Sequence, residues 1–111
     1  MTSGGEDLIR RMRRLDGLHD TIASAYVGAW EVMVGGGPDR YVVTATGVAG
    51  VANALSGDQT GAEDDTVDLT VGGQAVDYPT RYVLSRAEAE EAVRDLGTGD
   101  LRADRWEHQS W

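Results

Sequence analysis

Hydrophobic residues near the start of the chain recur at the spacing that puts them on one face of a helix: Leu8, Ile9, Met12 and Leu15. The arginines beside them fall mostly on the other face. Ser3, followed three residues later by Glu6, matches the capping-box pattern that opens helices. Gly17 is a suitable stop signal. The segment is therefore predicted to be an amphipathic helix that ends before Gly17.

The pattern changes from helical to alternating in the next part of the chain. Residues 26–34 alternate between large apolar positions and smaller or mixed ones, and residues 40–46 are rich in β-branched side chains, so each run predicts a strand. Residues 35–39 between them are Gly-Gly-Gly-Pro-Asp, which is typical of a turn. We expect the two strands to form an antiparallel hairpin.

Small side chains dominate residues 48–55 and suit either a third strand or a short helix. Gly47 and Gly50 disfavour the helix, and the preceding run is already extended, so we interpret this segment as a strand. Residues 56–65 contain two glycines and four acids and are predicted to form an exposed loop.

Residues 66–71 alternate strictly between polar and apolar side chains, which predicts a strand with one solvent-facing side. The two glycines that follow at 72 and 73 predict a tight turn. Residues 74–78 are then expected to form a short return strand.

A second helix is the clearest element of the sequence. Ser85 and Glu88 form a second capping-box pattern, and apolar residues follow on one helical face: Ala89, Ala92, Val93 and Leu96. Gly97 and Gly99 are expected to end this helix, and residues 101–111 to add a short final strand. The order of elements predicts an α+β fold in one domain, residues 1–111. In it, the N-terminal helix and the helix in the last third of the chain pack on an antiparallel sheet of about five strands.

Composition narrows the class of protein. The 111 residues suffice for one domain. There is no cysteine, which excludes a disulfide framework, a thiol nucleophile and a cysteine-based zinc site. No run approaches the ~18–20 apolar residues that a membrane span needs, and residues 1–15 lack the apolar core of a secretory signal. We therefore expect a cytoplasmic protein that does not bind membranes.

Negative charge is concentrated in one quarter of the chain. The formal net charge is −9, and residues 53–80 contain no base and six acids: Asp58, Glu63, Asp64, Asp65, Asp68 and Asp77. An acidic chain repels nucleic acid and anionic lipid, so direct binding to either is not expected. The concentrated acids predict either a solvated loop or a surface for a cationic protein.

The residue patterns needed for catalysis or metal binding are weak in this sequence. His19 and His108 lie far apart, and neither belongs to a His-x-x-x-His pair. The glycines at 35–37 precede a predicted strand rather than a helix, so they favour a turn over a phosphate loop. The acids at 63–65 lack the alternating ligand spacing of a calcium loop. We therefore expect a protein that is not an enzyme and has no catalytic residues, no metal and no cofactor.

The tryptophans are expected to serve two purposes. Trp30 and Trp106 occur in strand-like contexts and are predicted to lie in the core, where each can bury ~150–250 Å². Trp111 is the last residue of the chain. An aromatic side chain there is either incidental or an anchor that a partner buries, and we favour the anchor.

The last third of the chain carries a pattern that resembles one known family. A strand ends in Tyr82-Val83-Leu84, and the features that follow are Ser85 opening a helix, Glu88, Ala92 and Leu96 on that helix, Gly99 beyond it and Trp106 in a closing strand. This pattern resembles the immunity proteins of bacterial polymorphic toxin systems, specifically Imm family one. In that family a proline often precedes the helix and an Arg-Pro pair precedes the tryptophan, whereas this chain has Leu84-Ser85 and Arg102-Ala103.

The resemblance implies a partner and a way of acting. Members of this family guard against secreted deaminase toxins, including one that acts on cytosine in double-stranded DNA. The resemblance therefore implies an antitoxin that forms a one-to-one complex with a cognate deaminase domain. Deaminases that flip a base work in a narrow pocket, and we expect basic walls around it. We accordingly expect the acids of residues 56–68 to supply much of the toxin contact: Asp58, Glu63, Asp64, Asp65 and Asp68.

Two other classes of function fit the same sequence. One is an acidic mimic of nucleic acid, or an adaptor, that binds a different basic protein. The other is a non-catalytic domain that binds a small ligand or accompanies an enzyme. A salt-sensitive complex with one toxin domain separates the antitoxin from both of them, and a bound small molecule favours the last.

Overall fold

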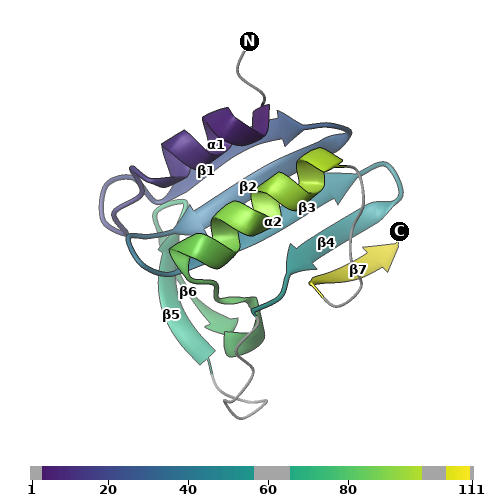
Figure 1. The fold of residues 1–111 in the computed structure, drawn as a ribbon. Coiled ribbons are helices and arrows are strands. Elements are labelled where there is room, and N and C mark those ends of the chain that lie inside the picture. The colour runs from purple at the N-terminus through teal and green to yellow at the C-terminus, as the bar shows by residue number, and fades with distance from the viewer. Residues whose placement is uncertain (1–3, 57–65, 99–104, 111) are drawn as a thin grey trace.

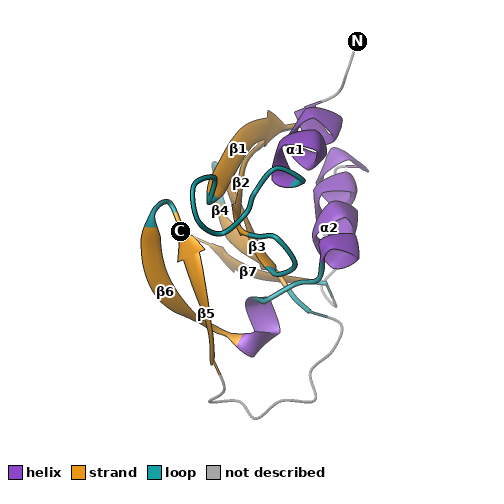
Figure 2. Cartoon of the chain, turned by 90° about the vertical axis from the view of Figure 1, so that its left-hand side faces the viewer, coloured by secondary structure: helices purple, strands orange, loops and turns teal. Residues whose placement is uncertain are grey.

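Two helices lie on one face of a five-stranded antiparallel sheet, and a separate two-stranded hairpin lies on the other face (Figures 1 and 2). The computed structural model describes residues 4–56, 66–98 and 105–110. In chain order the elements are α1 (Gly4–Met12), β1 (Ile22–Val27), β2 (Trp30–Gly36), β3 (Tyr41–Gly47), β4 (Gly50–Ala54), β5 (Thr66–Val71), β6 (Gln74–Pro79), the 3-10 turn η1 (Thr80–Tyr82), α2 (Arg86–Thr98) and β7 (Trp106–Ser110). This arrangement confirms the predicted α+β class.

The large sheet has the strand order β1-β2-β3-β4-β7, and every neighbouring pair is antiparallel. Residues that face each other across the strands share a side of the sheet. One row on the helix-covered side contains Ala23, Val34, Val43, Ala54 and Trp106, and all five are buried. Small and β-branched side chains thus form the sheet side of the core.

The helices supply the other half of the core. Their inward residues are those that the sequence pattern predicts: Leu8, Ile9, Met12 and Leu15 from the first segment, and Ala89, Ala92, Val93 and Leu96 from α2. All eight are buried. The alanines at 45 and 52 on the sheet leave room for these helical side chains, so α1 and α2 both pack on one sheet face.

The first helix ends earlier than the prediction placed its end. It stops at Met12, and the amides of Arg14 and Leu15 bond to carbonyls three residues back, which tightens the last turn. The carboxylate of Asp16 then accepts the amides of Leu18, His19 and Asp20, and these hydrogen bonds lower its pKa. A turn closed in this way competes with further helix. Ser3, the predicted cap, lies outside the described residues.

The predicted strand at 26–34 is wrong in its extent, because it contains a hairpin. Residues 28 and 29 form a two-residue turn between β1 and β2, and Val27 faces Trp30 across it. Gly28 has a φ of 60°, a conformation that glycine adopts without strain. The following β2–β3 pair confirms the second predicted hairpin, but β2 continues through Gly36, so its turn covers residues 37–40 instead of the predicted 35–39.

The strands β5 and β6 also differ from the expectation of a single sheet. They pair only with each other and pack on the open side of β2. Gly35 explains this contact, because a Cβ at that position would overlap Cγ1 of Val71. The turn at 72–73 is held by a hydrogen bond of 2.9 Å from the amide of Gly73 to Oγ1 of Thr21. The hairpin is therefore a third layer, anchored at its turn end.

The capping box of α2 is confirmed. The Ser85 hydroxyl accepts the Glu88 amide at 3.2 Å, and the Glu88 carboxylate accepts the Ser85 amide at 3.0 Å. The helix continues through Gly97 to Thr98, so Gly97 does not end it as predicted. The other predicted stop, Gly99, lies outside the described residues.

We predict that Gly35→Ala destabilises the protein by about 1–3 kcal/mol, because its methyl group overpacks the site of Val71. Urea unfolding followed by tryptophan fluorescence measures this loss. Gly35→Ala combined with Val71→Ala makes room for the new methyl group, so the double variant loses less than the sum of the two single variants. Strict additivity would contradict the packing of β5 on β2.

Candidate functional site

The β5–β6 hairpin has an inner apolar side and an outer acidic side. Leu69, which is 7% exposed, and Val71 face inward with their cross-strand partners. Asp68 and Asp77 lie on the outer side, where both are exposed to solvent. Alternation along two short strands thus presents carboxylates on a surface that the sheet and the helices leave uncovered (Figure 2).

The two carboxylates are direct cross-strand partners. The register of β5 and β6 places Asp68 opposite Asp77. Like charges in this position repel and destabilise a hairpin. In residues 4–56, 66–98 and 105–110, no arginine lies within ion-pair distance of either carboxylate. Within the described part of the chain this pair of acids is therefore not neutralised, and the repulsion between them does not stabilise the fold.

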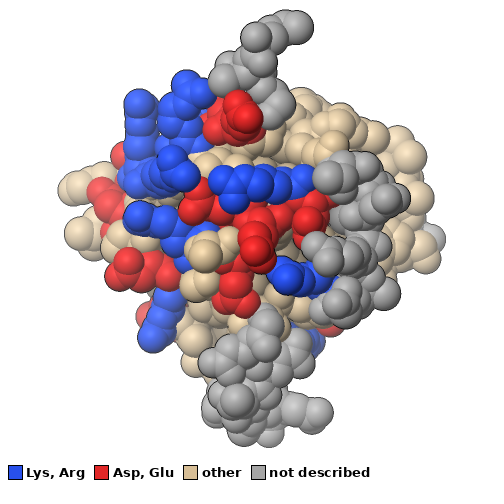
Figure 3. Space-filling model, in the orientation of Figure 1, with Lys and Arg blue, Asp and Glu red and all other residues tan. Residues whose placement is uncertain are grey.

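The charges of the helix side are arranged differently. Acidic and basic side chains alternate over α1 and α2 in Figure 3. Arg13 contacts Glu90 at 2.5 Å, and Arg105 contacts Glu91 at 2.8 Å. Arg94 also approaches Glu90, at 3.9 Å. Three acids of this side, Asp7, Glu90 and Glu91, thus lie beside arginines, whereas the described residues give Asp68 and Asp77 no such partner.

The residues that the sequence predicted for partner contact are only partly described. Asp68 lies on the exposed side of the hairpin, as the prediction required. The others fall outside the described residues: Asp58, Glu63, Asp64, Asp65 and Trp111. Asp77 was not among the predicted contacts. The Gly72-Gly73 turn could have identified Asp77 from the sequence. A two-residue turn fixes the register of the two strands, and that register pairs Asp77 with Asp68.

A second polar group lies where η1, which follows β6 directly, meets the edge strand β7. Tyr82 donates a hydrogen bond of 2.5 Å to Glu107, and Arg81 donates one of 3.0 Å to the Tyr82 hydroxyl. The Arg81 guanidinium also lies 4.5 Å from the centre of the Tyr82 ring. Burial and the bond to Glu107 raise the pKa of Tyr82. This cluster is internally neutralised, and it fixes the chain between the hairpin and α2 against β7.

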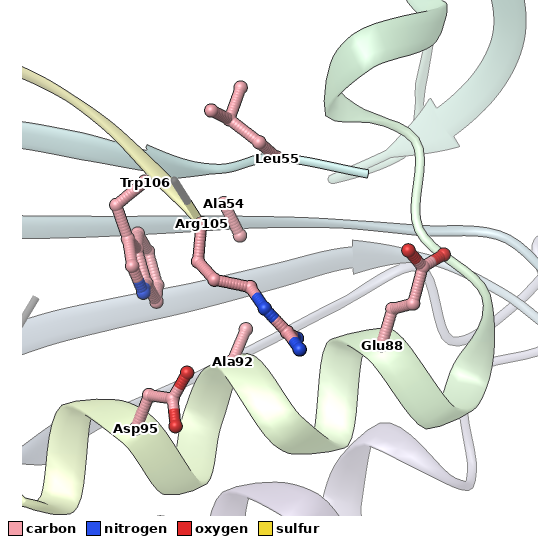
Figure 4. Close-up of a pocket in the computed structure, with 7 residues that line it drawn as sticks. All are labelled: Ala54, Leu55, Glu88, Ala92, Asp95, Arg105 and Trp106. Carbon is pink, nitrogen blue, oxygen red and sulfur yellow. The ribbon is translucent and has the colours of Figure 1, made fainter. Parts of the chain in front are cut away.

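The interior between α2 and the sheet has no room for a small ligand near Trp106. A cavity of about 10 Å³ is lined by Ala54, Ala92, Asp95 and Trp106, among others (Figure 4). That volume holds at most one water molecule. Trp106 is 3% exposed, which matches its predicted core position. Trp30 is half-buried and packs against the core.

Neither histidine belongs to a group of potential metal ligands in the described residues. The ring of His108 meets Trp30 edge to face at 6.3 Å between centroids, and His19 is exposed in the loop after α1. Within the described ranges, no three His, Asp or Glu side chains are grouped so that they could hold a metal ion. No helix of the same ranges is long and apolar enough to cross a membrane.

Comparisons with known proteins do not identify a relative. No protein-family model matches the chain, and no curated protein or solved structure is significantly similar to it. The candidate site therefore stands on its own geometry.

We predict that Asp77→Asn stabilises the protein by about 0.2–1 kcal/mol at low ionic strength, because it removes the repulsion from Asp68. The gain should shrink as added salt screens the charges. Urea unfolding at two salt concentrations measures both effects. In an Asp68→Asn background the same substitution should give no gain, and a gain of equal size there would show that the two carboxylates do not interact.

Proposed function

We propose that this protein is an immunity protein that binds a cognate secreted deaminase toxin in the cytoplasm and inhibits it. The toxin is proposed to be a nucleic-acid cytidine deaminase whose substrate groove is blocked in the complex. The observation that carries the proposal is the exposed, unneutralised pair Asp68 and Asp77 on a hairpin that stands apart from the main sheet.

The acid pair fits the chemistry of such a partner. An enzyme that grips nucleic acid presents basic side chains along its groove. Carboxylates without an arginine partner among the described residues are attracted to such a groove without first breaking an ion pair of that part of the chain. Complementary charge mainly accelerates association and sets its orientation. The hairpin is therefore assigned the role of first contact with the toxin.

Tight inhibition needs more than surface charge, because exposed ion pairs each contribute little affinity. Apolar anchors next to the charges usually supply most of the binding energy. Trp111 remains the proposed aromatic anchor from the sequence. The other predicted contact acids, at 58 and 63–65, come before β5 in the sequence and remain part of the proposal.

The assay of the proposal uses the deaminase domain encoded beside this gene. Equimolar protein is expected to abolish cytosine deamination, and the mixture is expected to run as a one-to-one complex in size-exclusion chromatography. Full activity without a complex would exclude the antitoxin role. A complex that leaves deamination intact would instead favour an acidic adaptor.

We predict that Asp68→Asn combined with Asp77→Asn slows association with the toxin domain roughly twofold to tenfold at low ionic strength. Stopped-flow fluorescence across a salt series measures the rate, and the variant should show a weaker salt dependence than the wild type.

The matched control removes two acids from the helix side, Asp7→Asn with Glu91→Gln, and so makes the same change in net charge. If this control slows association equally, the hairpin has no special part in the encounter. Alanines at Glu63, Asp64 and Asp65 extend the same comparison to the segment before β5.

A further inference from the structure

The strand β7 forms one edge of the large sheet, and its backbone has an unpaired side. The amide of Leu55 bonds to the carbonyl of Arg105 at 2.8 Å, which fixes which residues of the last strand point toward β4. In an antiparallel ladder the bonding direction alternates. The N–H and C=O groups of Trp106, His108 and Ser110 therefore point away from the sheet. Among the described residues, no backbone partner meets these groups.

The opposite edge, β1, has one side-chain partner. Helix α1 packs against β1, and the Arg11 guanidinium donates a hydrogen bond of 2.7 Å to the outward carbonyl of Ser24. Proteins commonly cover or charge their sheet edges, because a bare edge recruits another strand. Among the described residues, the Ser24 carbonyl at the β1 edge thus has a partner, whereas no such contact meets the outward groups of β7.

The sequence of β7 does not contain the usual blocking residues. It is Trp-Glu-His-Gln-Ser, without proline or lysine. Its one acid, Glu107, is held by Tyr82 and Arg81. His108, Gln109 and Ser110 are exposed. The strand thus offers a straight backbone and neutral side chains to an incoming strand.

The strand is also complementary to itself. If two copies run antiparallel about a two-fold axis at His108, then Trp106 faces Ser110 of the other copy, and Glu107 faces Gln109. The outward backbone groups of Trp106, His108 and Ser110 then become hydrogen-bonded pairs. A carboxylate opposite an amide is favourable, whereas an axis at Glu107 would set two carboxylates against each other.

We propose that β7 is a homodimerisation edge, at which a second copy of this chain extends the five-stranded sheet through a two-fold antiparallel pairing centred on His108. The pairing is isologous, so it closes at two copies and does not propagate. It leaves the outer side of the β5–β6 hairpin uncovered, so it goes beyond the proposed antitoxin role and does not depend on it.

Net charge gives this dimer a characteristic salt response. Each copy carries −9, so long-range repulsion opposes association, and added salt screens it. Self-association is therefore expected to strengthen with salt, whereas the complex with a basic toxin weakens. The two kinds of association are separable in one titration.

The test is sedimentation equilibrium of the full chain at low and high salt, up to millimolar protein. Gln109→Glu places a second carboxylate opposite each Glu107 and is expected to raise the dimer dissociation constant at least about threefold. Gln109→Arg is expected to lower it. Val48→Glu and Val48→Arg make the same changes in net charge at a fully exposed position in the β3–β4 turn, and they should shift it far less.

A backbone variant tests the hydrogen bonds directly. His108→Pro removes an outward N–H, which an edge strand tolerates, and it is expected to abolish the dimer, while His108→Ala keeps the N–H and the dimer. Circular dichroism establishes that both variants fold. A chain that stays monomeric at high salt, or a dimer that survives His108→Pro unchanged, overturns the proposal. So does a β7 edge whose amides become protected from hydrogen exchange only when the toxin domain binds.

Discussion

The fold depends on one crossing of the chain between the two sides of the large sheet. The β5–β6 hairpin lies on one side and α2 on the other, so the segment between them must pass around the sheet (Figure 2). Two backbone hydrogen bonds between Tyr41 and Leu84, of 2.9 and 2.7 Å, fix this passage at the start of β3. The Tyr41 and Leu84 side chains are both fully buried, which makes the crossing part of the core.

This crossing also determines what the hairpin can present. Its turn is tied to Thr21, its inner side rests on Gly35, and its far end leads directly into the fixed segment. With both ends held and one side packed, only the outer side remains available, and that side carries Asp68 and Asp77. The acidic surface is therefore a preorganised one, which lowers the entropy lost on binding.

Local patterns in the sequence predicted most of the helices and strands, but they did not predict the contacts between segments that are distant in the sequence. The spacing of Leu8 to Leu15 and the Ser85–Glu88 box identified both helices because helical periodicity and capping are local properties. The turn at Gly28 was missed because small residues at 28 and 29 preserve an apparent alternation. Gly35 gave no sign that Val71 packs on it, since that contact joins positions 36 residues apart (71 − 35). The concentration of acids in the sequence made Asp68 a candidate contact residue. The pairing of Asp77 with Asp68 became visible only from the register of β5 and β6.

The distribution of charge in the described layers is uneven. The two helical segments, residues 4–15 and 86–98, together contain six arginines and six acids, a balance of zero, whereas the hairpin from 66 to 79 contains two acids and no base, a balance of −2. These segments lie on opposite sides of the sheet (Figure 2). A cationic surface therefore exerts a torque as well as an attraction, and it turns the hairpin toward itself while the two proteins are still separated by solvent. The sheet keeps this negatively charged layer apart from the helix layer, whose charges balance.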